Sequence, residues 1–200
     1  QIKMVKTIAL SLTLTLLAFS SSFCDLYSDI YDNEKFHFSI LPPTDWIKNI
    51  REPSDSEIVV TFKNIHGSLT IAVRPAQDFH KRIIGIITQN NLSKSQLAEL
   101  ANMIYGKSQG VIEPSVFITK LGDQRALGSF YIYAYKALSN IKYMIIFKAE
   151  TIRFNYFYKV EFATTSSDSV EAATKEFNSI SKELQLAIKT FYFTSTPHGQ

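Results

Sequence analysis

The sequence predicts an α+β domain built as an α/β/α sandwich. Helices flank a central, largely antiparallel sheet of about six to seven strands, and a long C-terminal helix closes the fold. Three observations support this prediction. Alternating apolar residues recur in closely spaced segments from 111 to 164, which is typical of an antiparallel meander. Two segments with helical periodicity lie between residues 78 and 105. An apolar stripe at steps of three and four runs from Val170 to Phe191.

The N-terminal residues have the pattern of an export signal. Lys3 and Lys6 precede the uncharged apolar stretch 7–19, whose 13 residues are fewer than the roughly 20 that a membrane-spanning helix needs. A buried or amphipathic N-terminal helix is the alternative, but the stretch has no polar stripe. We therefore predict a signal peptide over 1–23, a single domain over 24–200, and an exported protein that is periplasmic or secreted in a bacterium.

Cys24 is the only cysteine, and the residues around it are compatible with two forms of the mature N-terminus. Small residues at Ala18, Ser20 and Ser22 suit an ordinary signal peptidase, which favours cleavage near Ser22. The alternative is a membrane-anchored lipoprotein acylated at Cys24, although Phe23 stands where that pattern has a small residue. With one cysteine, no internal disulfide can form.

Composition and charge exclude a nucleic-acid partner. Without Lys3 and Lys6, the 21 basic residues become 19 against 18 acidic ones, a net charge of +1, and no basic stripe occurs. The 46% hydrophobic content is enough for one core, and there is no repeat or low-complexity linker. Contact with a membrane is predicted only through a lipid anchor at Cys24.

The first elements are expected to be strands. Alternation over 36–40 predicts a strand that ends at Pro42 and Pro43. Trp46 follows where the chain turns back, and we expect it to cover the open end of the core, with ligand stacking as the alternative. Segments 57–64 and 68–75 predict a hairpin with Gly67 in its turn.

The helices and the meander come next. A helix is expected from Asp78, and a second over 93–105 has a capping box of Ser93 with Gln96 and a stop at Gly106. The meander strands are 111–121, 126–137, 141–151 and 154–164, with turns near Ser139 and Arg153. The terminal helix is expected to begin near Asp168, with Asp168 and Glu171 as its capping box.

Together these elements resemble the PsbP-like group, which includes a DcrB-type branch and a Ran-binding branch. The resemblance extends over about residues 34–193, and its most specific part is the opening "FHFSILPPTDW". Further parts are "SLTIAVRP", "FNYFYKVEFAT" and a terminal helix running into "FYF". The resemblance implies an antiparallel sheet between helices and implies no catalytic residue.

Motifs that would indicate an enzyme lack their structural context. The "GKSQG" sequence formally matches a hydrolase elbow at Ser108, but a helix precedes it and a strand follows it, the reverse of what the elbow requires. The four histidines show no zinc-ligand spacing, although His37 and His66 could approach each other on neighbouring strands. Asp123 and Glu150 could meet as a carboxylate pair, but nothing selects them from other acids. We therefore expect no cofactor and no metal.

Three tyrosines give the best functional hypothesis. Tyr131, Tyr133 and Tyr135 share one face of a strand, where they either pack under a helix or, with Trp46, form a binding surface. We predict a non-enzymatic module that binds or supports another envelope protein. The alternative is a carrier or sensor of a small apolar ligand held between sheet and helices, and a hydrolase or metalloenzyme is more remote.

Overall fold

The computed structural model describes residues 30–50, 58–89 and 91–194. The chain divides into Gln1–Ile30 and Tyr31–Gln200, and the description below concerns the second unit. The predicted signal peptide and Cys24 lie outside the described residues. Among the helices that are described, none is long and apolar enough to cross a bilayer.

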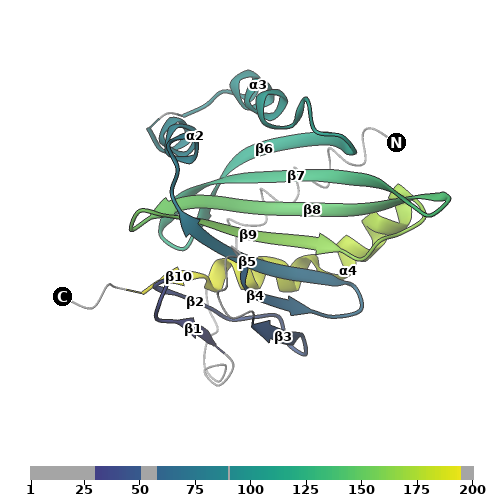
Figure 1. Ribbon diagram of the computed structural model, residues 1–200, viewed down its shortest axis with the longest axis horizontal. Helices are drawn as coiled ribbons and strands as arrows, with labels where there is room; N and C mark the ends of the chain where they lie inside the picture. The colour runs from purple at the N-terminus through teal and green to yellow at the C-terminus, as the bar shows by residue number, and fades with distance from the viewer. Residues whose placement is uncertain (1–29, 51–57, 90, 195–200) are drawn as a thin grey trace. The chain divides into compact units, whose positions relative to one another are not determined.

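A seven-stranded antiparallel sheet forms the centre of the unit (Figure 1), which confirms the predicted sheet and its meander. In spatial order the strands are β3 (Ile47–Ile50), β4 (Ile58–Lys63), β5 (Gly67–Pro75), β9 (Tyr156–Thr164), β8 (Asn140–Arg153), β7 (Gln124–Ala137) and β6 (Val111–Leu121). The long central strands alternate between two buried faces, because both faces carry helices.

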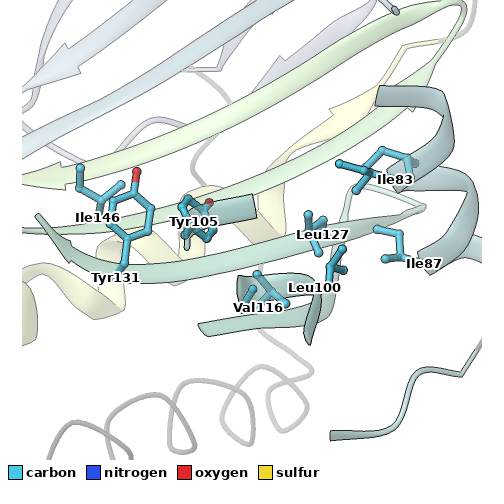
Figure 2. Packing of buried hydrophobic residues seen from close by; sticks show 10 residues of the cluster. Ile83, Ile87, Leu100, Tyr105, Val116, Leu127, Tyr131 and Ile146 are labelled. Atoms are coloured by element: carbon cyan, nitrogen blue, oxygen red, sulfur yellow. The ribbon is translucent and has the colours of Figure 1, made fainter. Parts of the chain in front are cut away.

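Helices cover the two faces as predicted for a sandwich. Helices α2 (Asp78–Gln89) and α3 (Lys94–Tyr105) pack on the face formed by β6, β7 and β8, and α4 (Val170–Thr190) packs on the opposite face against β8 and β9. Figure 2 shows apolar side chains filling the space between α2–α3 and the sheet. The predicted capping box of α3 is present: the Ser93 hydroxyl accepts a hydrogen bond from the Gln96 amide, and the Gln96 side chain accepts one from the Ser93 amide.

A second, three-stranded sheet was not predicted. Its order is β1 (Tyr31–Asn33), β2 (Phe38–Ile40) and β10 (Tyr192–Phe193). The strand expected over 36–40 begins only at Phe38, because His37 has a φ of 53° and belongs to a turn. Ser39, a polar residue between the apolar Phe38 and Ile40, is fully buried, and its hydroxyl donates a hydrogen bond to the Asp32 carboxylate.

The N-cap of α4 is Ser169, so the predicted capping box at Asp168 is wrong. Ser169 has extended backbone angles, and its hydroxyl accepts a hydrogen bond of 3.1 Å from the Ala172 amide. The Asp168 carboxylate instead forms an ion pair of 2.6 Å with Lys142 on the neighbouring hairpin. A sequence with two adjacent capping residues does not tell which of them caps the helix.

We expect Ser169→Ala to lower the free energy of unfolding by about 1 kcal/mol, because the Ala172 amide loses its acceptor. Asp168→Ala is the matched control and should cost less, since its ion pair is exposed to solvent and screened. Urea denaturation of the two variants measures both values. A larger loss for Asp168→Ala than for Ser169→Ala would contradict this N-cap assignment.

One end of the sheet is held by Arg153. Its guanidinium donates to both carboxylate oxygens of Asp123, at 2.7 and 2.9 Å, and lies over the rings of Phe154 and Phe193. The Asp123 carboxylate is thus paired with Arg153, and none of its described contacts is with Glu150. Although desolvation alone would raise the pKa of Asp123, hydrogen bonds from Gln124 and Arg153 and the charge of Arg153 hold it below its usual value.

Candidate interaction surface

Trp46 belongs to the core and not to a surface. Its ring is buried and lies 6.2 Å from the ring of Phe162, and its indole N–H donates a hydrogen bond of 2.9 Å to Glu183 on α4. The Trp46 indole therefore connects the segment that follows Pro42 and Pro43 with the C-terminal helix α4. The prediction that Trp46 belongs to a binding surface is therefore wrong. Its buried position agrees with the other interpretation, in which Trp46 covers the core.

Tyr131 is also buried, beneath α3. Its ring centroid lies 5.0 Å from that of Tyr105, and both rings belong to the apolar cluster that Figure 2 shows. The Lys148 ammonium lies over the Tyr131 ring at 5.1 Å. The predicted tyrosine face is therefore divided: Tyr131 is buried within the α2–α3 cluster, and Tyr133 packs against that cluster but is only half-buried.

Tyr133 and Tyr135 lie at that outer end and are half-buried. Their rings stack with centroids 5.9 Å apart and an interplanar angle of 19°. Gly110 allows the chain to pass close by: its φ is 78°, and a Cβ there would lie 2.3 Å from the carbonyl oxygen of Ala134. The two half-buried tyrosines are therefore stacked side by side on β7, and their role as a binding surface stays a prediction.

The β7–β8 hairpin extends beyond its neighbours (Figure 1). Strand β6 pairs with β7 as far as Tyr133, and β9 pairs with β8 as far as Ile146. Past those points the described contacts to other segments include the Ala134 amide with the Gly110 carbonyl at 2.7 Å, the Ile145 amide with the Thr164 hydroxyl at 2.9 Å, and the bridge between Tyr143 and Ser167. The end of the hairpin is therefore an exposed structural element supported mainly by its own two strands.

Two apolar side chains at this end were missed by the sequence reasoning. Leu138, in the turn, is 98% exposed, and Ile141, at the start of β8, is 57% exposed. Leu138 has a φ of 56°, a left-handed conformation that leucine rarely adopts, at the first central position of a two-residue turn, where glycine is favoured. The available signal was an apolar residue inside a turn that is otherwise polar.

A comparison with the next turn shows that Leu138 is unusual. Phe154, in the β8–β9 turn, also has a positive φ, of 51°, but its ring packs against Phe193, His37 and the Arg153 guanidinium. Packing offsets the backbone strain at Phe154. The Leu138 side chain is exposed, so no packing offsets the backbone strain there. We call Tyr133, Tyr135 and Leu138 the hairpin surface. Ile141 pairs with Lys136 and therefore lies on the opposite face of the hairpin from the two tyrosines.

The charged groups beside Tyr131 form an ion-pair network. Glu161 accepts from Lys148 at 3.4 Å and from Lys159 at 3.3 Å. Burial alone would lower the pKa of Lys148, but the neighbouring Tyr131 and the Glu161 carboxylate raise it, and burial raises the pKa of Tyr131. Burial likewise raises the pKa of Glu150. Lysine and tyrosine thus keep their protons at neutral pH, so neither is prepared to act as a base.

The remaining candidate residues are separated. Ser108 lies in the loop between α3 and β6, as expected. His66 contacts Glu176 at 2.6 Å, His80 accepts from Arg74 at 2.6 Å, and His37 lies against Phe154, so each described histidine has its own separate neighbour. His198 lies outside the described residues. Within the described ranges, no three His, Cys, Asp or Glu side chains gather where they could hold a metal ion.

The fold and the hairpin surface define an α/β/α sandwich domain with an exposed, partly apolar β-hairpin. No family model and no curated protein matches the chain. Among solved structures it is similar to cyanobacterial PsbP (CyanoP) from Synechocystis, with 12% identity, a TM-score of 0.46, and coverage of 88% of this chain and 98% of that one.

Two further solved structures are similar to this chain. A crystal structure from Bacteroides thetaiotaomicron has 12% identity and a TM-score of 0.44, covering 80% of this chain and 46% of that one. LpqN, involved in cell envelope biogenesis of Mycobacterium tuberculosis, has 8% identity and a TM-score of 0.44, covering 79% and 83%. The predicted PsbP-like resemblance is thus found at the level of the fold alone, and no residue role is taken from it.

Proposed function

We propose that this protein is a non-enzymatic binding module that supports another protein of the cell envelope and contacts it through the hairpin surface. The observation that carries the proposal is Leu138. A left-handed backbone costs an L-residue about 1–2 kcal/mol, and a side chain that is 98% exposed recovers nothing from the core. Burial of this leucine against a second molecule would offset the backbone strain, which packing within the domain does not offset.

The tyrosines complete a surface suited to protein recognition. Tyrosine offers a large apolar ring with a polar end and loses little side-chain entropy on binding, which is why it is enriched at interfaces. Tyr133 and Tyr135 are already stacked in the free protein, so little ordering is needed. The envelope location rests on the predicted export signal over 1–23.

The absence of enzymatic activity is part of the proposal and has its own support. The raised pKa values of Lys148 and Tyr131 leave both groups in their ordinary protonation states, and Ser108 stands alone in a loop. The alternative of an apolar-ligand carrier placed its ligand between sheet and helices, where the cluster of Figure 2 is packed. It stays a prediction, and native mass spectrometry of the purified protein would detect a bound lipid.

Leu138→Asn tests the proposal because it separates binding from stability. Asparagine tolerates the left-handed conformation, so we expect this variant to be at least as stable as the wild type in thermal unfolding. Crosslinking in envelopes of the native host, followed by affinity purification, should recover one specific protein with the wild type. Recovery should fall by about tenfold or more with Leu138→Asn, the effect of losing one buried apolar anchor.

The matched control is Ile65→Asn, which changes a side chain that is 82% exposed in the β4–β5 turn. This variant should recover the same protein as the wild type. Equal recovery with wild type, Leu138→Asn and Ile65→Asn would refute the role of the hairpin surface. Measured substrate turnover abolished by Ser108→Ala would refute the non-enzymatic function.

A further inference from the structure

A shallow apolar groove lies between α2 and α3. It has a volume of about 420 Å³, and its apolar lining consists of Ile86 from α2, Leu92 from the connection, and Leu100 and Met103 from α3. Ile86 is 44% exposed and Met103 62%, so the groove is open to solvent. An apolar cavity of about 150 Å³ takes up a benzene molecule, and the groove therefore has room for one or two aliphatic side chains.

The groove carries a single charge. Its polar lining residues are Gln96, Glu99 and Asn102, of which only Glu99 is charged. Glu99 is exposed, and within the described ranges its carboxylate forms no ion pair. The groove therefore favours an occupant that combines apolar side chains with a cation beside them.

The closed end of the β7–β8 hairpin has this combination. Leu138, in the turn, is 98% exposed, and Ile141 is 57% exposed. Ile141 pairs with Lys136, so both side chains lie on one face of the hairpin, opposite Tyr133 and Tyr135. Lys136 is exposed, and among the residues that the structure describes none forms an ion pair with it. We call Lys136, Leu138 and Ile141 the hairpin tip.

The hairpin tip is placed too far out to enter the groove of its own chain. Strand β6 pairs with β7 as far as Tyr133, and the chain then continues to Leu138. At about 3.3 Å per residue, those few residues carry the turn about 16 Å past the last pair with β6. In Figure 1 the closed end of the hairpin projects past the other strands, at the other end of the sheet from α2. The tip and the groove can therefore meet only between two copies of the chain.

We propose that the hairpin tip of one copy docks into the groove between α2 and α3 of a second copy. Leu138 and Ile141 enter the apolar groove, and the Lys136 ammonium pairs with the Glu99 carboxylate at its border. Burial of Leu138 in this contact offsets the backbone strain of its turn. The contact is small, so self-association is expected in the micromolar range or weaker.

Self-association occupies Leu138, which also belongs to the hairpin surface. Two copies joined in this way cannot present that leucine to an envelope partner, although Tyr133 and Tyr135 lie on the other face of the hairpin. Self-association therefore competes with the partner for one side chain. This regulatory consequence rests on the proposed function, whereas the contact between copies does not.

Exchange of the two charges tests the contact by sedimentation velocity of the purified full chain over a range of concentrations. Glu99→Lys and Lys136→Glu should each weaken self-association by about threefold or more, because a repulsion replaces an attraction. The double variant keeps the wild-type net charge and should regain wild-type association. Lys182→Glu, on an exposed position of α4, is the control for the change in net charge and should associate like the wild type.

Apolar substitutions test the same contact from both sides. Ile141→Ser in the hairpin tip and Met103→Ser in the groove should each weaken self-association by about tenfold. Both side chains are exposed, so thermal unfolding should stay unchanged. Neither residue belongs to the hairpin surface, so crosslinking in envelopes should still capture the partner with both variants.

Two results would overturn the contact between copies: a monomer at every concentration, or a double charge variant that associates no better than the single ones. Association that is equal in all variants would overturn it as well, because another segment would then join the copies. These results leave the proposed function intact if Leu138→Asn still abolishes capture of an envelope protein. Conversely, charge exchange that restores self-association, with no protein captured from envelopes, would count against the proposed function alone.

Discussion

Replacing Phe177 with alanine is expected to lower the free energy of unfolding by about 3–5 kcal/mol, the usual cost of removing a fully buried phenylalanine ring. Phe177 has no exposed surface and projects from α4 against the sheet, where its ring centroid lies 5.5 Å from Phe130 and 5.9 Å from Phe162. Loss of this ring removes aromatic contacts with two strands and leaves a cavity between the layers.

Guanidinium denaturation followed by circular dichroism measures this loss. The matched control is Asn178→Ala on the exposed side of the same helix, where we expect a change within about 0.5 kcal/mol. Phe177→Leu should fall between the two, because leucine fills part of the cavity. A loss for Phe177→Ala no larger than that for Asn178→Ala would mean that α4 does not pack against the sheet in this way.

Stability is expected to fall steeply between pH 10 and pH 12. Burial raises the pKa of Tyr105 and of Tyr158 from 10.0 to about 12 in each case. Between these values the unfolded tyrosine has released its proton while the folded one retains it, so the unfolded state binds fewer protons and stability decreases as pH rises. Each tyrosine accounts for about 2–3 kcal/mol of that loss, and the loss is absent below about pH 9.

Phenylalanine variants identify the groups responsible. Tyr105→Phe keeps the ring and removes the titrating hydroxyl, so its free energy of unfolding should change less over this interval. Tyr158→Phe also loses the hydrogen bond of 2.8 Å to the Phe36 carbonyl, and is expected to be less stable at neutral pH. The exposed Tyr192→Phe serves as the control. Parallel pH profiles for the wild type and both buried variants would disprove this assignment.

The meander and the terminal helix could be predicted because their information is local. Alternation along β9 and the three-and-four spacing along α4 are both set by residues close in sequence. The two-residue connection between β7 and β8 was likewise indicated by Ser139. Such patterns identify an element and its buried side, although the N-cap of α4 differed by one residue.

The small sheet could not be predicted because its strands have two or three residues and pair across the whole domain. Ser39 pairs with Tyr192, and no periodic pattern marks either segment as half of a ladder. The division of the tyrosine face could not be predicted either, because it also depends on contacts between residues far apart in the sequence. Tyr131 and Tyr133 are equivalent in sequence, and only the position of α3 decides that the first is buried and the second is half-exposed.

The pairing of β2 with β10 also determines when the domain can finish folding. Strand β2 is made early in synthesis, but its second neighbour appears only after α4 has been completed. Until then one hydrogen-bonding edge of β2 lies open, together with the apolar rings of Phe38 and Phe191, which stack 5.3 Å apart in the finished domain. The small sheet can therefore be completed only after α4 has been made, and a truncated chain that ended before Tyr192 would leave one hydrogen-bonding edge of β2 unpaired.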